Sequence, residues 1–489
     1  MSKHPGLKVE YAFRESLGDK NQHDPLWKMP ERGVFTEDFV EDLETGRCDL
    51  VVHSWKDLPV AERVGTEIIA TLPRADVRDL LLLKPARFED VRAGRAPFEI
   101  LSSSPRRAYN LASALPRLLP GVSERSPDFR SIRGNIPTRL EKFLGDDAAV
   151  GLVLAKAALD RLLTAPEGEF AELQARLRAS LRGLRFVVLP VALDPPAAAQ
   201  GALAVEAKRG RAELRALWDG LHCADTFECV QEERRILASH GGGCHQKIGV
   251  HVAKLRGHRF EVLKGLTEAG VRLDERRLER KISFEAPTGW SEVFPRPDER
   301  SGFGFERRPL EAPKAGEAEA LYVSKAEAWR PELASAEQVV WTAGLETWTK
   351  LVARGVFVSG SDEGLGERLP LLPWRPELAW RKLSHAEAPS RSELPLRATY
   401  SLLPVGTVPE LASRRFFFWA SASLFERARA ANPTLAARGV HACGPGHTAD
   451  ALAAAGVSAD RLWICLGYED WSKELGLEAD SRRETASVP

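Results

Sequence analysis

The chain has 489 residues, enough for roughly three domains at ~150 residues each, and its 69 lysines and arginines balance its 69 aspartates and glutamates. The zero formal net charge argues against a general nucleic-acid-binding protein, and no apolar run approaches the ~18 residues of a membrane span. Met1–Pro5 lack the apolar core of a signal peptide, and six cysteines in so long a chain indicate reduced thiols in a cytoplasm, not a disulfide framework.

The first segment has a βαβ pattern. Leu7–Phe13 alternates apolar and polar residues, which predicts a strand, and Gly33–Leu43 predicts a helix. Leu50–His53 and Glu67–Leu72 follow as further strands. Strands alternating with a helix predict a parallel sheet with right-handed crossovers.

Ionisable residues come directly after the buried strand at Leu50–His53. Lys56 and Asp57 form an adjacent pair, and Pro59 ends the element. Open α/β sheets bind ligands just beyond the carboxyl ends of their strands, so this pair is a candidate site. The alternative is a strand that ends in a solvated Lys–Asp pair.

Arginines recur at equivalent ends of the next strand–helix units. Ser104 and Pro105 are suited to the N-cap and first position of a helix, and two arginines follow in its first turn. Either these arginines extend into solvent, or they hold an anion together with backbone N–H groups. The anion-binding interpretation predicts a ligand with several carboxylates or phosphates, bound by Arg106, Arg107, Arg133, Arg139 and Arg161.

One cysteine stands out in the following segment. In His240–His245 three glycines precede Cys244, which leaves its thiol reachable by a bulky group. The rival interpretation is a metal site, although the spacings match no compact zinc pattern; its ligands would be Cys223, Cys229, Cys244, His240 and His245. Residues 285–318, rich in Pro, Gly and Glu, predict a linker, after which an α/β rhythm resumes.

Five ordered stretches resemble the hydroxymethylbilane synthase (porphobilinogen deaminase) family and cover about residues 5–310. The matches are His53-Ser54-Trp55-Lys56-Asp57, Ser103-Ser104-Pro105-Arg106-Arg107, Arg133-Gly134-Asn135 with Thr138-Arg139, Gln200-Gly201-Ala202-Leu203, and Gly242-Gly243-Cys244. The resemblance implies an α/β fold. Two doubly wound, periplasmic-binding-protein-like domains with a cleft would span 1–98 (re-entered at about 187–215) and 99–186. A small α+β domain at 222–310 would carry the cysteine.

The resemblance also implies the chemistry. Four porphobilinogen units would condense stepwise, with loss of ammonia, onto a dipyrromethane cofactor bound covalently to Cys244, releasing a linear tetrapyrrole for haem-type biosynthesis. Asp57 would be the catalytic carboxylate, and Lys56 would offset a substrate carboxylate. The cofactor carboxylates would be held by Ser103, Ser104, Arg106, Arg107, Arg133, Arg139 and Arg161. We expect a monomer without metal, membrane or nucleic-acid partners; the alternative is an inactive carboxylate-binding relative.

The chain departs from the family pattern at its start. The family's opening strand and helix are absent, and Leu7–Phe13 resembles the family's second strand. An inner strand missing from a sheet leaves buried N–H and C=O groups unpaired. We therefore expect either that the natural chain begins upstream or that the first domain folds poorly. Asp194-Pro195-Pro196 also enlarges the loop before Gln200, and Phe35 matches a phenylalanine of a mobile loop in the family.

Residues 318–489 resemble one half of uroporphyrinogen-III synthase. The similar stretches are Ala398-Thr399-Tyr400, Phe418–Ser423 and Cys443–Ala449. The resemblance implies a C-terminal α/β domain that acts on the linear tetrapyrrole, and the alternative is a degenerate domain without chemistry.

Overall fold

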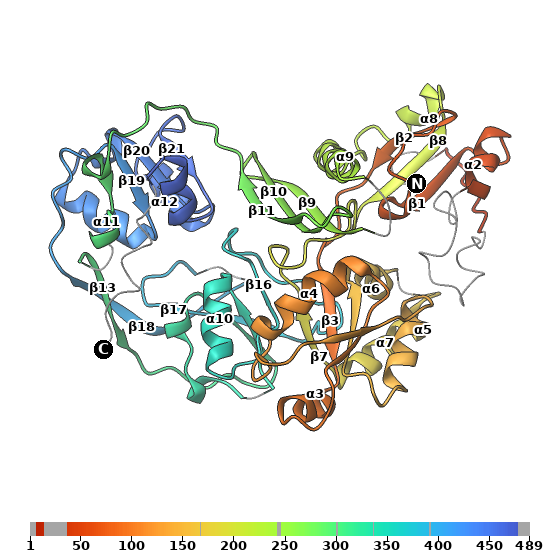
Figure 1. The fold of residues 1–489 in the computed structure, drawn as a ribbon, viewed down its shortest axis with the longest axis horizontal. Coiled ribbons are helices and arrows are strands. Elements are labelled where there is room, and N and C mark those ends of the chain that lie inside the picture. The colour runs from red at the N-terminus through yellow and green to blue at the C-terminus, as the bar shows by residue number, and fades with distance from the viewer. Residues whose placement is uncertain are drawn as a thin grey trace. The chain divides into compact units, whose positions relative to one another are not determined.

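The computed structural model describes residues 6–13, 37–166, 168–241, 246–299, 302–335, 337–390 and 393–477. The chain is a mixed α/β protein that divides into two compact units (Figure 1). The first unit comprises residues 1–254, 261–276 and 371–376, and the second comprises residues 255–260, 277–370 and 377–489. None of the helices in the described ranges is long and apolar enough to cross a membrane.

The first sheet has the order β1-β8-β2, formed by Leu50–Ser54, Leu203–Lys208 and Thr66–Thr71. The prediction of a purely parallel sheet is wrong here, because β8 lies between β1 and β2 and runs antiparallel to both. β1 and β2 therefore run parallel to each other, although only a 3₁₀ turn, and no α-helix, lies between them in the chain. The central strand comes from a part of the chain that lies far downstream, a pairing that no local pattern can reveal.

The second sheet has the order β5-β4-β6-β3-β7, and its central strands β4 and β6 are parallel while β3 is antiparallel to β6 and β7. Its strands are Asp128–Arg130, Glu99–Leu101, Gly151–Ala155, Asp79–Leu83 and Arg185–Val188. This arrangement corrects the expected domain boundary at residues 98/99, because β3 belongs to the second sheet. All five β3 residues are buried, as befits a strand with a neighbour on each side.

Helices flank these sheets. Their bounds are α2 Glu37–Glu44, α3 Pro85–Arg92, α4 Pro105–Leu118, α5 Ile136–Leu144, α6 Lys156–Thr164, α7 Ala171–Arg182 and α8 Ala212–Ala216. Ser104 caps α4 as predicted, since its side chain accepts a hydrogen bond from the Arg107 N–H. Asn135 caps α5 in the same way through the Thr138 N–H. These caps fix where each helix begins, and so fix the arginines of the adjacent loops and first turns.

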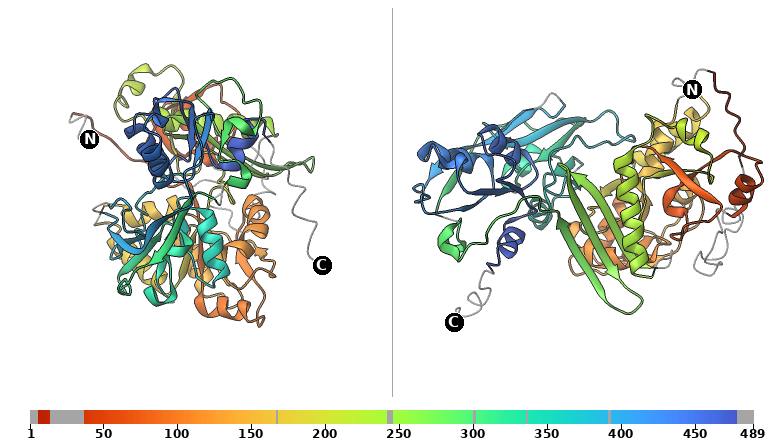
Figure 2. Two further views of the ribbon diagram at one scale, coloured as in Figure 1. Left: turned by 90° about the vertical axis from the view of Figure 1, so that its left-hand side faces the viewer. Right: turned by 90° about the horizontal axis from the view of Figure 1, so that it is seen from above.

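The segments before and after Cys244 form a helix and a three-stranded sheet, respectively. Helix α9 spans Ala224–Ser239, and the sheet β11-β10-β9 comprises Arg272–Leu278, His258–Leu266 and Lys247–Leu255. Cys229 and Ile236 of α9 pack against apolar residues of this sheet. Figure 2 shows the ribbon of α9 running beside the sheet. Cys244 itself lies outside the described residues.

The second unit contains two further sheets. Four parallel strands have the order β12-β19-β20-β21 (Val293–Phe294, Phe416–Trp419, Val440–Cys443, Leu462–Ile464). Six strands have the order β13-β18-β17-β14-β15-β16 (Gly304–Pro309, Leu396–Val405, Ala379–His385, Glu319–Val323, Val339–Thr342, Gly360–Ser361). The helices are α10 Leu345–Ala353, α11 Ala422–Ala431, α12 His447–Ala454 and α13 Tyr468–Glu474.

Two predicted boundaries in this region are wrong. Strands β12 and β13 pair with β19 and β18, so residues 293–309 complete sheets of the second unit and neither end a third domain nor form a linker. Val293 and Phe294 are buried there among aromatic residues, which the Pro- and Gly-rich composition of the segment concealed. Conversely, Trp374 comes from the C-terminal part of the chain but belongs to the first unit, where its ring lies 5.3 Å from that of Phe186.

The strand predicted at Leu7–Phe13 does not form. These residues have no regular structure, and Tyr11 and Phe13 are 74% and 95% exposed. The alternating pattern is present, but a strand needs a partner, and none of the described strands pairs with it.

Candidate active site

Lys56 and Asp57 lie on a short 3₁₀ turn, η2 (Trp55–Asp57), directly after β1. The buried Trp55 ring packs among alanines of the β8 segment. The backbone N–H of Trp55 donates to the Ala202 carbonyl at 3.0 Å. The buried Trp55 therefore fixes the turn, while the Asp57 side chain is exposed. The Asp57 carboxylate makes no hydrogen bond or ion pair with any described residue, so it is free to meet a ligand.

The Lys56 ammonium is held beside this carboxylate. Its Nζ donates to Gln200 Oε1 at 3.3 Å, and Gln200 in turn donates to Asp79 Oδ1 at 2.8 Å. Burial lowers the pKa of Lys56, and the nearby Arg107 acts in the same direction, while Asp57 opposes them.

Arg106 and Arg107 are buried and already have carboxylate partners. Arg106 binds Asp79 at 2.6 Å and Asp194 at 2.8 Å, and Arg107 forks onto both oxygens of Asp79 at 2.7 and 2.8 Å. Burial acts to raise the pKa of Asp79, but the guanidinium groups of Arg107 and Arg106 outweigh it and hold this pKa far below its usual range. The pair predicted to bind external carboxylates thus forms an internal ionic cluster.

The other three predicted arginines have no carboxylate partner among the described residues. The side-chain hydrogen bond of Arg139 goes to the Gly134 carbonyl at 2.6 Å. Burial lowers the pKa of Arg133, Arg139 and Arg161, that of Arg139 to about 10 with help from the charges of Arg107 and Arg133. The charge of Asp57 acts to raise the pKa of both Arg139 and Arg161. Asp57, Arg139 and Arg161 therefore share one electrostatic environment.

Ser103 and Ser104 hold the loops of this site together. Ser103 Oγ accepts from the Ile132 N–H at 2.9 Å and donates to the Ile132 carbonyl at 2.5 Å, joining the α4 loop to the loop before Arg133. Ser104 caps α4. A role for either hydroxyl in binding cofactor carboxylates stays a prediction.

Residues that sequence reasoning missed stabilise the site. Asp79 begins β3 as a charged residue before four leucines, and Asp194 lies in the loop noted only for its length. A charged residue at the end of a fully buried strand is a signal that a counter-charge is needed. Behind the turn, Glu233 of α9 holds Arg74 at 2.6 Å and accepts from the Ala199 N–H at 2.7 Å, which ties the cysteine-bearing segment to the first sheet.

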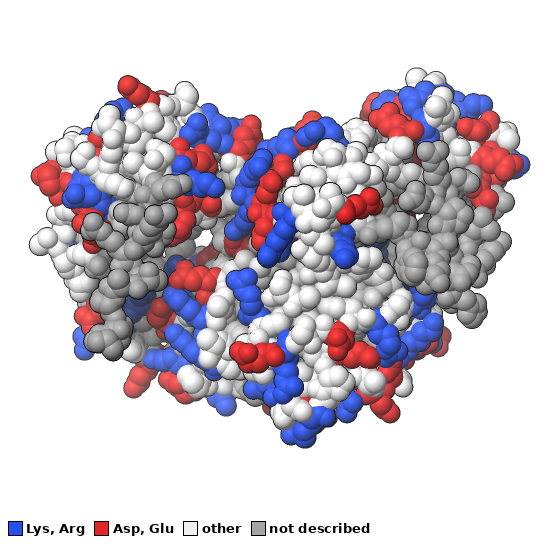
Figure 3. Space-filling model, in the orientation of Figure 1, with Lys and Arg blue, Asp and Glu red and all other residues white. Residues whose placement is uncertain are grey.

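Cys244 and His245, like Phe35, lie outside the described residues. Within the described residues no group of three or more His, Cys, Asp or Glu side chains is arranged to hold a metal ion. Acidic and basic side chains are interspersed over the face in Figure 3, which fits the zero net charge.

Comparisons with known proteins identify the family to which this chain belongs. The family profile described as "Porphobilinogen deaminase, dipyromethane cofactor binding domain" matches residues 1–216. The porphobilinogen deaminase of Bordetella parapertussis is 33% identical over 280 residues, 57% of this chain and 78% of that protein. That of Syntrophotalea carbinolica is 35% identical over 249 residues, covering 51% and 70% of the two chains. Among solved structures, YhfZ from Shigella flexneri covers 42% of this chain at 13% identity, and its TM-score of 0.18 is too low to bear on the fold.

Proposed function

Because this chain belongs to the porphobilinogen deaminase family, we infer that it is a hydroxymethylbilane synthase, a transferase that joins porphobilinogen units into a linear tetrapyrrole. The observation that carries this function is a set of three guanidinium groups that form no ion pair with any described residue, those of Arg133, Arg139 and Arg161. Two of them are electrostatically coupled to the exposed Asp57. Each pyrrole unit bears an acetate and a propionate, which are the counter-charges that these arginines lack.

The same donor set fits a dipyrromethane cofactor, which carries four carboxylates of this kind. When bound, this group supplies the pyrrole carbon at which chain growth starts. Arg133, Arg139 and Arg161 would hold its carboxylates, and Cys244 would attach it through a thioether. Arg106 and Arg107 would contribute mainly by fixing α4 and its loop through Asp79 and Asp194.

Asp57 is suited to the charge that develops during condensation. Porphobilinogen loses ammonia as its C–N bond breaks with the electron pair leaving on nitrogen, which generates a cationic azafulvene. The α-carbon of the preceding ring then forms the new C–C bond and releases its proton. An unpaired carboxylate beside the pyrrole N–H groups stabilises the cation and can take up that proton. Lys56, held by Gln200, would neutralise a substrate carboxylate.

Intact-protein mass measurement and ammonia release test this function together. The wild type should carry the added mass of dipyrromethane and release one ammonia for each porphobilinogen consumed. Cys244→Ser should carry no added mass and show no turnover, while Cys223→Ser serves as the matched control. Binding of porphobilinogen without ammonia release would instead support the alternative, an inactive carboxylate-binding relative.

We also propose that the protein acts as a monomer in the cytoplasm. The cysteines among the described residues are free thiols, which supports a reducing compartment. Light scattering of the purified protein would test the monomer directly.

A second activity is proposed for the second unit: closing the linear tetrapyrrole in the manner of uroporphyrinogen-III synthase. This unit has two mainly parallel sheets, and loops at the ends of such sheets commonly bind ligands. One loop of each sheet approaches the other: a Cβ added to Gly446, after β20, would lie 3.8 Å from the Cα of Gly366, after β16. The wild type supplied only with porphobilinogen should yield uroporphyrinogen isomer III in excess over isomer I. Isomer I alone would exclude this activity.

A further inference from the structure

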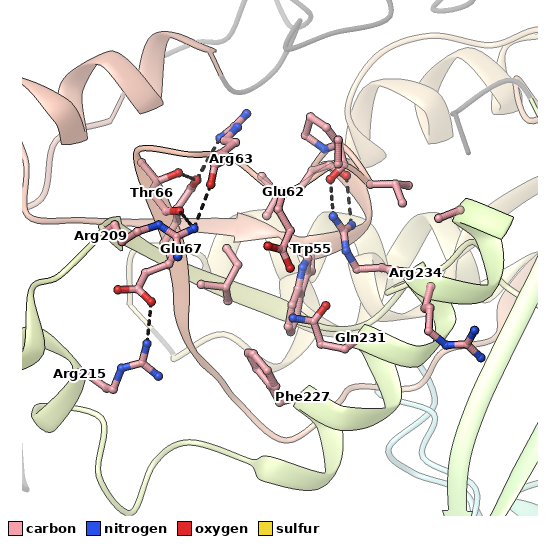
Figure 4. A pocket seen from close by; sticks show the side chains of 18 residues that line it. Trp55, Glu62, Arg63, Thr66, Glu67, Arg209, Arg215, Phe227, Gln231 and Arg234 are labelled. Atoms are coloured by element: carbon pink, nitrogen blue, oxygen red, sulfur yellow. Dashed lines mark hydrogen bonds and ion pairs between the residues drawn. The ribbon is translucent and has the colours of Figure 1, made fainter. Parts of the chain in front are cut away.

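The first unit contains a pocket of about 470 Å³, whose lining includes Trp55 and Leu58 but not the exposed Asp57 (Figure 4). The loop after η2, strands β2 and β8, and helix α9 form its walls. This volume lies within the roughly 300–1,000 Å³ that is usual for small-molecule sites. Apart from Trp55, which fixes the η2 turn, none of its lining residues has a role in the function inferred above.

The centre of the pocket is apolar. The rings of Trp55 and Phe227 lie 5.4 Å apart, and Ile68 packs against the same cluster. Figure 4 places these rings between arginines on two sides, with Arg209 and Arg215 at one end and Arg234 at the other.

Two of these arginines have no carboxylate partner among the described residues. Arg209 donates to the main-chain carbonyls of Arg63 and Val64, each at 3.0 Å. Arg234 donates to those of Leu58, at 3.2 Å, and Pro59. Carbonyl contacts fix a guanidinium group in place but leave its charge uncompensated.

The remaining charges of the pocket are mostly paired. Arg215 binds Glu67 at 2.8 Å, and Arg63 binds Glu206 at 3.1 Å. Glu62, exposed at the rim, offsets part of the Arg234 charge without forming an ion pair with it. Each end of the pocket therefore holds one fixed positive charge that no described carboxylate within ion-pair distance neutralises.

We propose that this pocket binds an elongated organic dianion with an aromatic or apolar centre and a carboxylate at each end. The two carboxylates would meet Arg209 and Arg234, and the centre would cover Phe227 and Ile68. Charge-assisted hydrogen bonds to guanidinium groups favour carboxylates, and the apolar floor disfavours compact, strongly hydrated anions such as phosphate. The proposal rests on this pocket alone and does not depend on the activity at Asp57.

Calorimetric titration of the full chain with biphenyl-4,4′-dicarboxylate tests the proposal. The wild type should bind this probe at one saturable site, and biphenyl-4-carboxylate should bind about tenfold more weakly because one carboxylate is lost. Arg209→Gln should weaken binding of the dicarboxylate by a similar factor. Arg92→Gln, which changes a surface arginine outside the pocket, should leave its affinity unchanged.

A further variant keeps the test independent of folding. Gln231 is exposed in the pocket and makes no hydrogen bond with the described residues, so Gln231→Glu adds a negative charge without removing a contact. It should weaken the dianion about tenfold. Absence of saturable binding, or wild-type affinity in both Arg209→Gln and Gln231→Glu, would overturn the proposal. Loss of binding in Arg139→Gln would do so too, because the probe would then occupy the Asp57 site.

Discussion

Two groups of arginines follow strands of the same sheet, in the same kind of strand–helix unit, yet they are in opposite electrostatic states. Arg106 and Arg107 are 4% and 7% exposed and share Asp79, with Asp194 as a further partner of Arg106. Arg133, Arg139 and Arg161 have no carboxylate partner among the described residues. The difference shows that an arginine beside a site does not by itself indicate ligand binding, since its counter-charge can be internal.

The internal cluster should dominate stability. Asp79→Ala leaves two buried guanidinium groups without their shared carboxylate, and we expect it to lower the free energy of unfolding by about 3–5 kcal/mol, as loss of one partner of a buried ion pair does. Urea denaturation followed by circular dichroism measures this change. Wild-type stability in Asp79→Ala would mean that the cluster contributes nothing and would remove the contrast between the two groups.

The same cluster predicts a pH dependence. The pKa of Asp79 is depressed in the folded chain, so its contribution to stability is present above its unfolded pKa of about 3.9 and is lost as the pH falls towards the folded value. The stability difference between wild type and Asp79→Asn should therefore shrink as the pH falls below about 4, which urea denaturation at a series of pH values would measure.

Replacing Asp57 should have the opposite consequence, a large loss of catalytic rate with little change in stability. Asp57→Asn should reduce turnover by about 10² or more, because the group that stabilises the cation and takes up the proton is lost. Its unfolding curve should match the wild type, since the carboxylate has no partner among the described residues. Glu124→Gln, at another exposed position, is the control for both measurements. A fold collapse in Asp57→Asn would assign Asp57 a structural role.

The arginines without partners should affect binding. Arg133→Ala or Arg139→Gln should raise the KM for porphobilinogen, or lower the loaded fraction of dipyrromethane seen by mass measurement, by about tenfold through loss of a charge-assisted bond. Stability should be unchanged. If Arg106→Ala impaired binding more than these variants while remaining fully stable, the assignment of the two groups would be reversed.

The smallest effect is expected at a surface pair of the same sheet. Arg130 binds Glu99 at 2.7 Å, but its side chain is 47% exposed. Glu99→Gln should change the free energy of unfolding by less than about 1 kcal/mol, because solvent and salt screen such pairs. A loss as large as that in Asp79→Ala would show that burial is not what separates the two groups.

The sequence by itself determined the local chemistry of this protein. It placed a strand before Lys56 and Asp57, the Ser104 cap, the order of the family motifs and a C-terminal α/β segment, because each depends on residues that are close in the chain. It also identified Arg133, Arg139 and Arg161 as candidates for the site, although their roles, like that of Cys244, stay predictions.

Only the tertiary structure decided which partners meet. β8 enters the first sheet from 132 residues beyond Thr71, β3 joins the second sheet, and β12 and β13 pair with strands of the second unit. Asp79 and Asp194 reach Arg106 across 27 and 88 residues. Strand pairing and ion pairing depend on which groups lie close together in space and on how deeply they are buried, because an unpaired buried group is costly. A pattern along the sequence contains neither the distance nor the burial.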